Sequence, residues 1–195
     1  MATLFAHKAS PHGWGGQWVL KDGDVELATA LDGLTRLRLE IEAGGRRFTA
    51  SERHRRTGFE VVEDATGQQV ADLAFTFFQD SGRNRGEVAA VNLATGATMA
   101  WNHLPHDRKL GFYETTGAPV ILVAHHVRFE PSARHGTFRT LMRFWGSIIK
   151  AQDQFQIHVE DAAVGRLVRP EELPILALLG IWLVITYDRR HNISH

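Results

Sequence analysis

The sequence contains no cysteine among its 195 residues. This absence excludes a disulfide framework, a thiolate nucleophile and a metal or iron–sulfur site with cysteine ligands. An excess of charge of one sign is also absent, because 22 Lys and Arg balance 22 Asp and Glu, and this balance argues against a surface built as a whole for nucleic acid. P-loops, dinucleotide fingerprints and nucleophile elbows are missing too. With 44% hydrophobic and 23% charged residues, the composition is that of an ordinary globular domain.

One apolar run stands near the C-terminus, where residues 173–187 read LPILALLGIWLVITY. Acidic residues precede the run at 171–172 and the cations Arg189 and Arg190 follow it, which is the charge order that a helix dipole favours. A helix that is apolar on every side must be buried, either in protein or in lipid. The run is shorter than the roughly 20 apolar residues of a membrane span. We therefore expect a core helix over about 171–189, with a membrane anchor as the alternative.

The rest of the chain, from about 17 to 169, has the pattern of antiparallel strands. In Leu37–Glu42 apolar and charged residues alternate, which is typical of a strand with one buried and one wet face. Apolar segments flank glycine-containing turns near Gly23, Gly67, Gly96 and Gly117, and a further hairpin is expected between 157–161 and 164–168. The unequal spacing of these turns favours a meander over a solenoid of fixed period.

The strands and the helix complement each other. Many short antiparallel strands either expose edges or close on themselves, and a barrel much wider than eight strands is not filled by side chains alone. An all-apolar helix needs such an enclosing wall. We expect one domain over 1–195, mainly β, in which a closed antiparallel β-barrel of about twelve strands surrounds a central hydrophobic C-terminal α-helix.

Hairpins of the form φ-x-φ-x-D-x-x-G-x-x-φ-x-φ, closed by the run LPILALLGIWLVITYDRR, resemble the tubby C-terminal-like superfamily, from about Trp18 to Arg190. That group includes tubby, LURP-one-related and phospholipid scramblase proteins, and the likeness is greatest to the small LURP-one-related or scramblase-like members. The resemblance implies a twelve-stranded barrel around the C-terminal helix, and tubby domains bind phosphoinositides through basic residues. The chain has neither the palmitoylatable cysteines nor the acidic calcium loop of animal scramblases, so the resemblance does not imply calcium-activated scrambling.

The segment 46–56, RRFTASERHRR, is the strongest local charge feature. Its five arginines face a single acid, Glu52, and we take them as candidate ligands for an anionic headgroup; they are Arg46, Arg47, Arg53, Arg55 and Arg56. Clustered arginines bind phosphate with paired hydrogen bonds. Since the segment adjoins a Gly-Gly turn, we expect it at one end of the barrel, where Arg83, Arg85, Arg108 and Lys109 could extend it. The alternative interpretation is a solvated, charged surface loop.

Histidines offer a weaker signal. His103, His106 and Asp107 could form a metal site, but Pro105 argues against helical spacing, and a polar loop explains the segment equally well. His125 and His126 are adjacent in a predicted strand, so their rings point to opposite faces and cannot share an ion. Trp14, between glycines, is a candidate for a membrane interface or for a lid over the barrel end.

These observations predict a non-enzymatic barrel module that binds anionic phospholipid headgroups or an acidic partner through a basic end, with no cofactor, no metal and no nucleic acid. It would be cytoplasmic and peripheral at the membrane. One alternative is a scramblase-like lipid transporter anchored by residues 173–187. A remote alternative is a metal-dependent hydrolase acting through His103, His106 and Asp107.

Overall fold

The computed structural model describes residues 1–9, 16–33, 38–53, 58–79, 85–104, 109–125 and 154–192. Within these ranges twelve strands precede one helix. They are β1 (Ala2–Lys8), β2 (Gln17–Asp22), β3 (Val25–Asp32), β4 (Arg38–Ala43), β5 (Arg46–Glu52), β6 (Gly58–Glu63), β7 (Gln69–Gln79), β8 (Arg85–Leu93), β9 (Thr98–Leu104), β10 (Lys109–Glu114), β11 (Pro119–His125), β12 (Gln154–Val159) and α2 (Leu173–Asn192).

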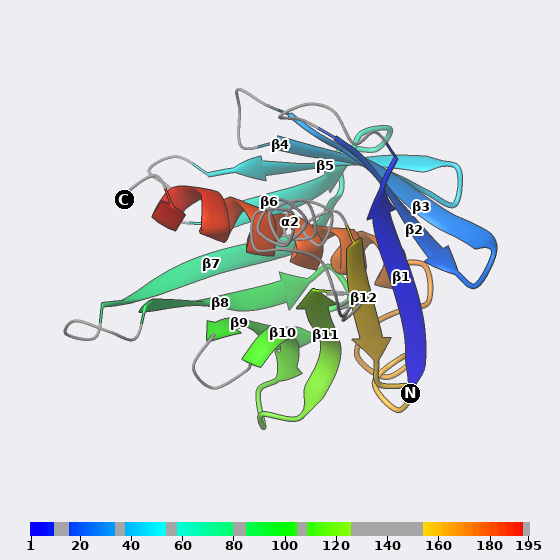
Figure 1. The fold of residues 1–195 in the computed structure, drawn as a ribbon. Helices are drawn as coiled ribbons and strands as arrows, with labels where there is room; N and C mark the ends of the chain where they lie inside the picture. The colour runs from blue at the N-terminus through cyan, green and yellow to red at the C-terminus, as the bar shows by residue number, and fades with distance from the viewer. Residues whose placement is uncertain are drawn as a thin grey trace, which may run out of the picture.

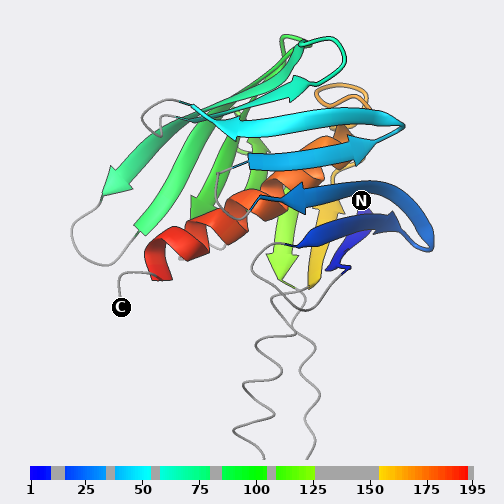
Figure 2. The same cartoon turned by 90° about the horizontal axis from the view of Figure 1, so that it is seen from above.

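The strands form a closed antiparallel barrel in which each pairs with its neighbours in sequence, and β1 closes the ring against β12 (Figure 1). The predicted barrel is therefore confirmed. Closure gives each of these strands a partner strand on both of its sides. Residues 160–172 then lead from β12 to α2, which lies along the inner face of the strands (Figure 2).

The alternation of apolar and charged residues in the sequence matches the two faces of the barrel wall. In β4, Leu39, Ile41 and Ala43 are buried, while Arg38, Glu40 and Glu42 are exposed. On β3 and β4, which lie nearest to α2, several inward residues are small, among them Ala28, Ala30 and Ala43. Small side chains at these positions make room for the helix.

Helix α2 fills the core of the barrel. Every residue from Ile175 to Val184 for which exposure is given is at most 2% exposed. On the side opposite β3 and β4, a Cβ atom at Gly180 would lie 3.1–3.4 Å from the side chains of Val123, Phe112 and Trp101. Glycine at this position lets the helix backbone approach the wall of β9, β10 and β11 closely.

The helix begins with a capping contact. The backbone N–H of Arg169 donates to Oε2 of Glu172 at 3.0 Å, and Leu173 N–H donates to the Arg169 carbonyl at 3.2 Å. A glutamate that reaches back to the start of the first turn satisfies a backbone donor that has no partner within the helix. The regular helix spans 173–192, two residues later at its start and three later at its end than predicted.

Two boundaries of the predicted strand region were wrong. A strand lies before residue 17, since β1 occupies Ala2–Lys8. The expected strand at 164–168 is instead a set of turns with an isolated bridge between Val164 and Val168, because Gly165 has a φ of 84° and its N–H donates to the Val168 carbonyl. The segment therefore folds back on itself and does not pair with β12.

The two ends of the barrel differ in how the strands are joined. The turns β2–β3, β4–β5, β6–β7, β8–β9 and β10–β11 are two to five residues long and lie at one end, together with residues 160–172; we call this the turn end. The other connections join odd-numbered strands to the next even-numbered strand at the opposite end, which we call the loop end. In Figure 1 the β2–β3 turn lies on the right and the C-terminus on the left.

Candidate functional site

The arginines of segment 46–56 lie at both ends of β5. Arg46 and Arg47 are its first residues, at the turn end, and Arg53 follows its last residue, at the loop end. Arg53 lies seven positions after Arg46 along this strand, or about 23 Å away at roughly 3.3 Å per residue. The expectation that the segment lies at one end of the barrel was wrong, because it includes a whole strand.

Arg46 is engaged in a local network at the turn end. Its Nε atom donates to Oε1 of Glu63 at 2.6 Å, and Thr66 Oγ1 donates to Oε2 of the same carboxylate at 2.7 Å. The Arg46 guanidinium also lies 5.1 Å from the centre of the Phe48 ring. Arg46 and Thr66 lower the pKa of Glu63 to about 2. The side chain of Glu63 is only 7% exposed, so Arg46 serves to neutralise a nearly buried carboxylate.

Arg47 points to the opposite face of β5, onto the outer wall. Its side chain is 76% exposed, and its Nε atom lies 3.8 Å from Oε2 of Glu42, its cross-strand partner. This distance is too long for a strong hydrogen bond. Arg47 is therefore accessible to a ligand, but at the turn end and beside an acid.

A groove of about 550 Å³ crosses the outer wall beside Arg47, over β3, β4 and β5. Its charged lining residues are Arg38, Glu40, Glu42, Arg47 and Asp64. Arg38 pairs with Glu40 at 3.2 Å, and Asp64 accepts a hydrogen bond of 2.8 Å from Thr49 Oγ1. With three acids against two arginines, this groove does not favour an anionic ligand.

At the loop end, Arg53 joins the β5–β6 connection to the outer wall. Its guanidinium forms an ion pair of 2.6 Å with Oδ1 of Asp72 in β7, and its backbone N–H donates to the Gly58 carbonyl at 2.9 Å. The side chain of Arg53 remains 37% exposed. Arg55 and Arg56, which follow it in sequence, lie outside the described residues, as do Arg83, Arg108 and the side chains of Arg85 and Lys109.

The histidine candidates are placed only in part. His103 is buried on the inner face of β9, and His106, Asp107, His126 and Trp14 lie outside the described residues. Within the described ranges, no three His, Asp or Glu side chains gather as a metal site requires.

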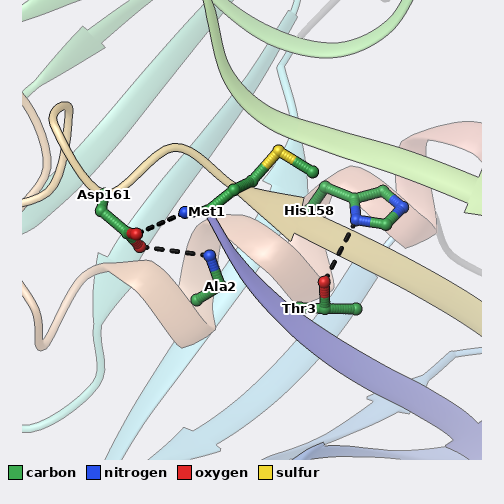
Figure 3. A network of polar contacts seen from close by, with 5 residues as sticks. All are labelled: Met1, Ala2, Thr3, His158 and Asp161. Carbon is green, nitrogen blue, oxygen red and sulfur yellow. Dashed lines mark hydrogen bonds and ion pairs between the residues drawn. The ribbon is translucent and has the colours of Figure 1, made fainter.

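A network that the sequence did not predict closes the seam between β1 and β12 (Figure 3). The Asp161 carboxylate pairs with the Met1 ammonium and accepts the Ala2 N–H at 3.1 Å. Beside it, Thr3 Oγ1 and His158 Nδ1 lie 3.3 Å apart. These contacts join segments more than 150 residues apart, and no local pattern in the sequence indicates them.

The described residues thus define a twelve-stranded antiparallel barrel with a buried helix, in which Arg53, partly exposed and paired with Asp72, stands at the loop end next to two further arginines in sequence. A comparison with protein-family models, curated proteins and solved structures finds no match. In the part of the chain that the structure describes, α2 included, no helix meets the length and hydropathy required of a bilayer span.

Proposed function

We propose that this protein is a non-enzymatic module that binds anionic phospholipid headgroups through Arg53, Arg55 and Arg56 at the loop end, as a peripheral membrane protein of the cytoplasm. The observation that carries the proposal is the division of the basic segment by β5. Arg46 is committed to Glu63 and Arg47 lies beside Glu42, whereas Arg53 begins a connection of five residues, three of which are arginines. The resemblance to tubby-like proteins is compatible with this function.

Arginine suits this role because its planar guanidinium forms two parallel hydrogen bonds to a phosphate. Each basic residue near an anionic membrane surface contributes about 1 kcal/mol. The ion pair with Asp72 holds the first of the three arginines in place. No cofactor is required for such binding.

The transporter alternative would require α2 to leave the barrel. Its residues from Ile175 to Val184 form the centre of the hydrophobic core, and their removal would expose the inner faces of the strands. We therefore do not propose that residues 173–187 enter a membrane. A metal-dependent hydrolase is not proposed either, since of its three candidate residues only His103 lies within the described ranges.

Co-sedimentation with phosphatidylserine-containing vesicles tests the proposal, with vesicles of phosphatidylcholine alone as the comparison. The double variant Arg55→Gln, Arg56→Gln should weaken binding by about 30-fold, since two charges contribute about 2 kcal/mol. Arg53 is left unchanged because its pairing with Asp72 also supports the fold.

The matched control is Lys21→Gln, Arg47→Gln, which removes the same charge at the turn end. It should change vesicle binding less than about threefold, because these residues lie beyond the reach of the surface field. Equal weakening by both double variants would contradict the assignment to the loop end. If the protein binds neither kind of vesicle, the proposal is wrong, and an acidic protein becomes the remaining partner class for this basic end.

A further inference from the structure

The groove on the outer wall is lined by described residues of three neighbouring strands. It crosses β3, β4 and β5, and its volume of about 550 Å³ falls within the range of small-molecule sites, roughly 300–1,000 Å³. Ala30, Ile41 and Phe48 line it although their side chains are buried in the core, so the backbone of the paired strands forms its floor. Because these backbone groups pair within the sheet, a ligand must be recognised by the side chains around the floor.

The charges along β4 have a fixed order in this groove. Arg38, Glu40 and Glu42 are alternate, exposed residues, so one positive charge near the loop end is followed by two negative charges toward the turn end. Neighbouring members of this row stand about 6.7 Å apart, at roughly 3.3 Å per residue. Arg47 lies opposite Glu42, and Asp64 also lines the groove, so two positive and three negative side chains leave one net negative charge.

The ion pairs within the groove are exposed and easily exchanged. Arg38 lies 3.2 Å from Glu40 and Arg47 lies 3.8 Å from Glu42, and the side chains in these pairs are between 47% and 76% exposed. Exposed pairs of this kind contribute little to stability. A ligand that brings the opposite charge to each side chain therefore replaces these pairs without a large loss.

An apolar side chain lies beside the charged row. Leu31 of β3 is the cross-strand partner of Glu40, lines the groove and is 53% exposed. Thr29, also on β3, is the partner of Glu42. A ligand that spans the two glutamates therefore covers Leu31 with its middle part, and the burial of apolar surface favours an aliphatic chain there.

We propose that this groove binds a free basic α-amino acid such as lysine, extended along β4. Arg38 binds the carboxylate with paired hydrogen bonds, Glu40 binds the α-ammonium group and Glu42 binds the ε-ammonium group. The aliphatic chain spans a distance comparable with two residues of strand and lies over Leu31. Lysine carries one net positive charge, which balances that of the groove. Arg53 is not among the described lining residues, so the inference does not depend on the proposed lipid binding.

Isothermal titration calorimetry of the full chain at low ionic strength tests the site with lysine and with analogues that each lack one of its charges. We expect a dissociation constant of about 1 mM or below for lysine. Norleucine lacks the ε-ammonium group, ε-aminocaproate the α-ammonium group and cadaverine the carboxylate, so each should bind at least about threefold more weakly. No binding of lysine up to about 10 mM, or equal affinity for lysine and any of the three analogues, would overturn the inference.

Single substitutions locate the binding. Glu42→Gln should lower the affinity for lysine at least about threefold, to that of norleucine, because it removes the carboxylate that meets the ε-ammonium group. The matched control Asp24→Asn removes the same charge from the exposed β2–β3 turn, outside the described lining of the groove, and should change the affinity less than about twofold. Denaturant midpoints equal to that of the wild type show that both variants fold. An affinity that Glu42→Gln leaves unchanged, or that both substitutions weaken equally, would overturn the site.

Discussion

The indole nitrogen of Trp182 donates a hydrogen bond of 3.1 Å to Oδ1 of Asp32, and both side chains are buried. The two residues are 150 positions apart in sequence. The Trp182 ring also meets Phe59 edge-on, with 4.7 Å between ring centres. Trp182 therefore connects α2 to the loop-end terminus of β3 and to β6, and fixes how far the helix extends through the barrel.

Removal of the acceptor in this pair should destabilise the protein. Asp32→Ala leaves a buried indole N–H without its partner, and we expect the free energy of unfolding to fall by about 1–3 kcal/mol. Asp32→Asn keeps a side-chain oxygen at the same place, so its free energy of unfolding should fall by less. Denaturant titration compares the two, and an unchanged midpoint for Asp32→Ala would contradict the role assigned to this hydrogen bond.

Deletion of residues 170–195 should abolish cooperative unfolding. The helix supplies the centre of the core, and the burial of each large apolar side chain contributes about 1.5–3 kcal/mol. Thermal or chemical denaturation followed by circular dichroism should show a broad, non-cooperative transition. A soluble truncated chain with a sharp transition would instead support a helix that acts outside the barrel.

Two strand glycines should not tolerate a methyl group. A Cβ atom at Gly58 would lie 1.8 Å from the Leu73 carbonyl oxygen, and at Gly111, where φ is 148°, it would lie 2.1 Å from that of Ile121. Both contacts are with backbone, so Gly58→Ala and Gly111→Ala should each cost at least about 1–3 kcal/mol of unfolding free energy.

Gly180→Ala is the comparison for these two variants. It meets only side chains, at 3.1–3.4 Å, and alanine is also the better helix former, so its effect should be clearly smaller. If Gly180→Ala lowers the free energy of unfolding as much as Gly58→Ala does, then α2 has no room to shift within the barrel.

The titration of Glu63 should make the free energy of unfolding depend on pH under acidic conditions, because the pKa of its carboxyl lies below the ordinary value for glutamate. Its pKa falls from 4.5 to about 2 in the folded protein, chiefly through the hydrogen bond from Arg46. A carboxylate with a lowered folded pKa stabilises the fold above its unfolded pKa, and this contribution is lost as the pH falls from about 4.5 toward 2. Glu63→Gln has no such titration.

The difference in unfolding free energy between wild type and Glu63→Gln should therefore be largest near neutral pH and should shrink as the pH approaches 2. Denaturant titrations of both proteins over this range measure it. A difference that is constant with pH would contradict the assigned coupling between Glu63 and Arg46.

The fold could be predicted from the sequence because its two main signals are local. Alternation in segments such as 38–43 and the unbroken apolar run from Ile175 identify wall and core without knowledge of contacts. β1 was missed because it has no hairpin partner before it in the chain, and its pairing with β12 joins residues that are 147 to 157 positions apart. The hydrophobic periodicity of one segment does not indicate which distant strand will pair with it.

The candidate site was predicted less well for a similar reason. Adjacency in sequence suggested that five arginines act together, but a strand turns alternate side chains to opposite faces and carries the chain from one end of the barrel to the other. Arg46, Arg47 and Arg53 thus have three different acidic neighbours, namely Glu63, Glu42 and Asp72. Glu63 could have been suspected as a partner from its place at the end of an apolar strand, whereas the bond from Trp182 to Asp32 gives no local signal.

The position of α2 after all twelve strands also affects how the protein is made. A ribosome adds roughly 5–20 residues each second, so every strand is synthesised before the segment that fills the core. Until 173–192 emerges, the inner faces carrying Phe59, Trp101 and Phe155 have no helix to cover them. The nascent chain therefore exposes these apolar inner faces until the last stage of synthesis. We expect the protein to depend most on chaperones during the time before α2 emerges.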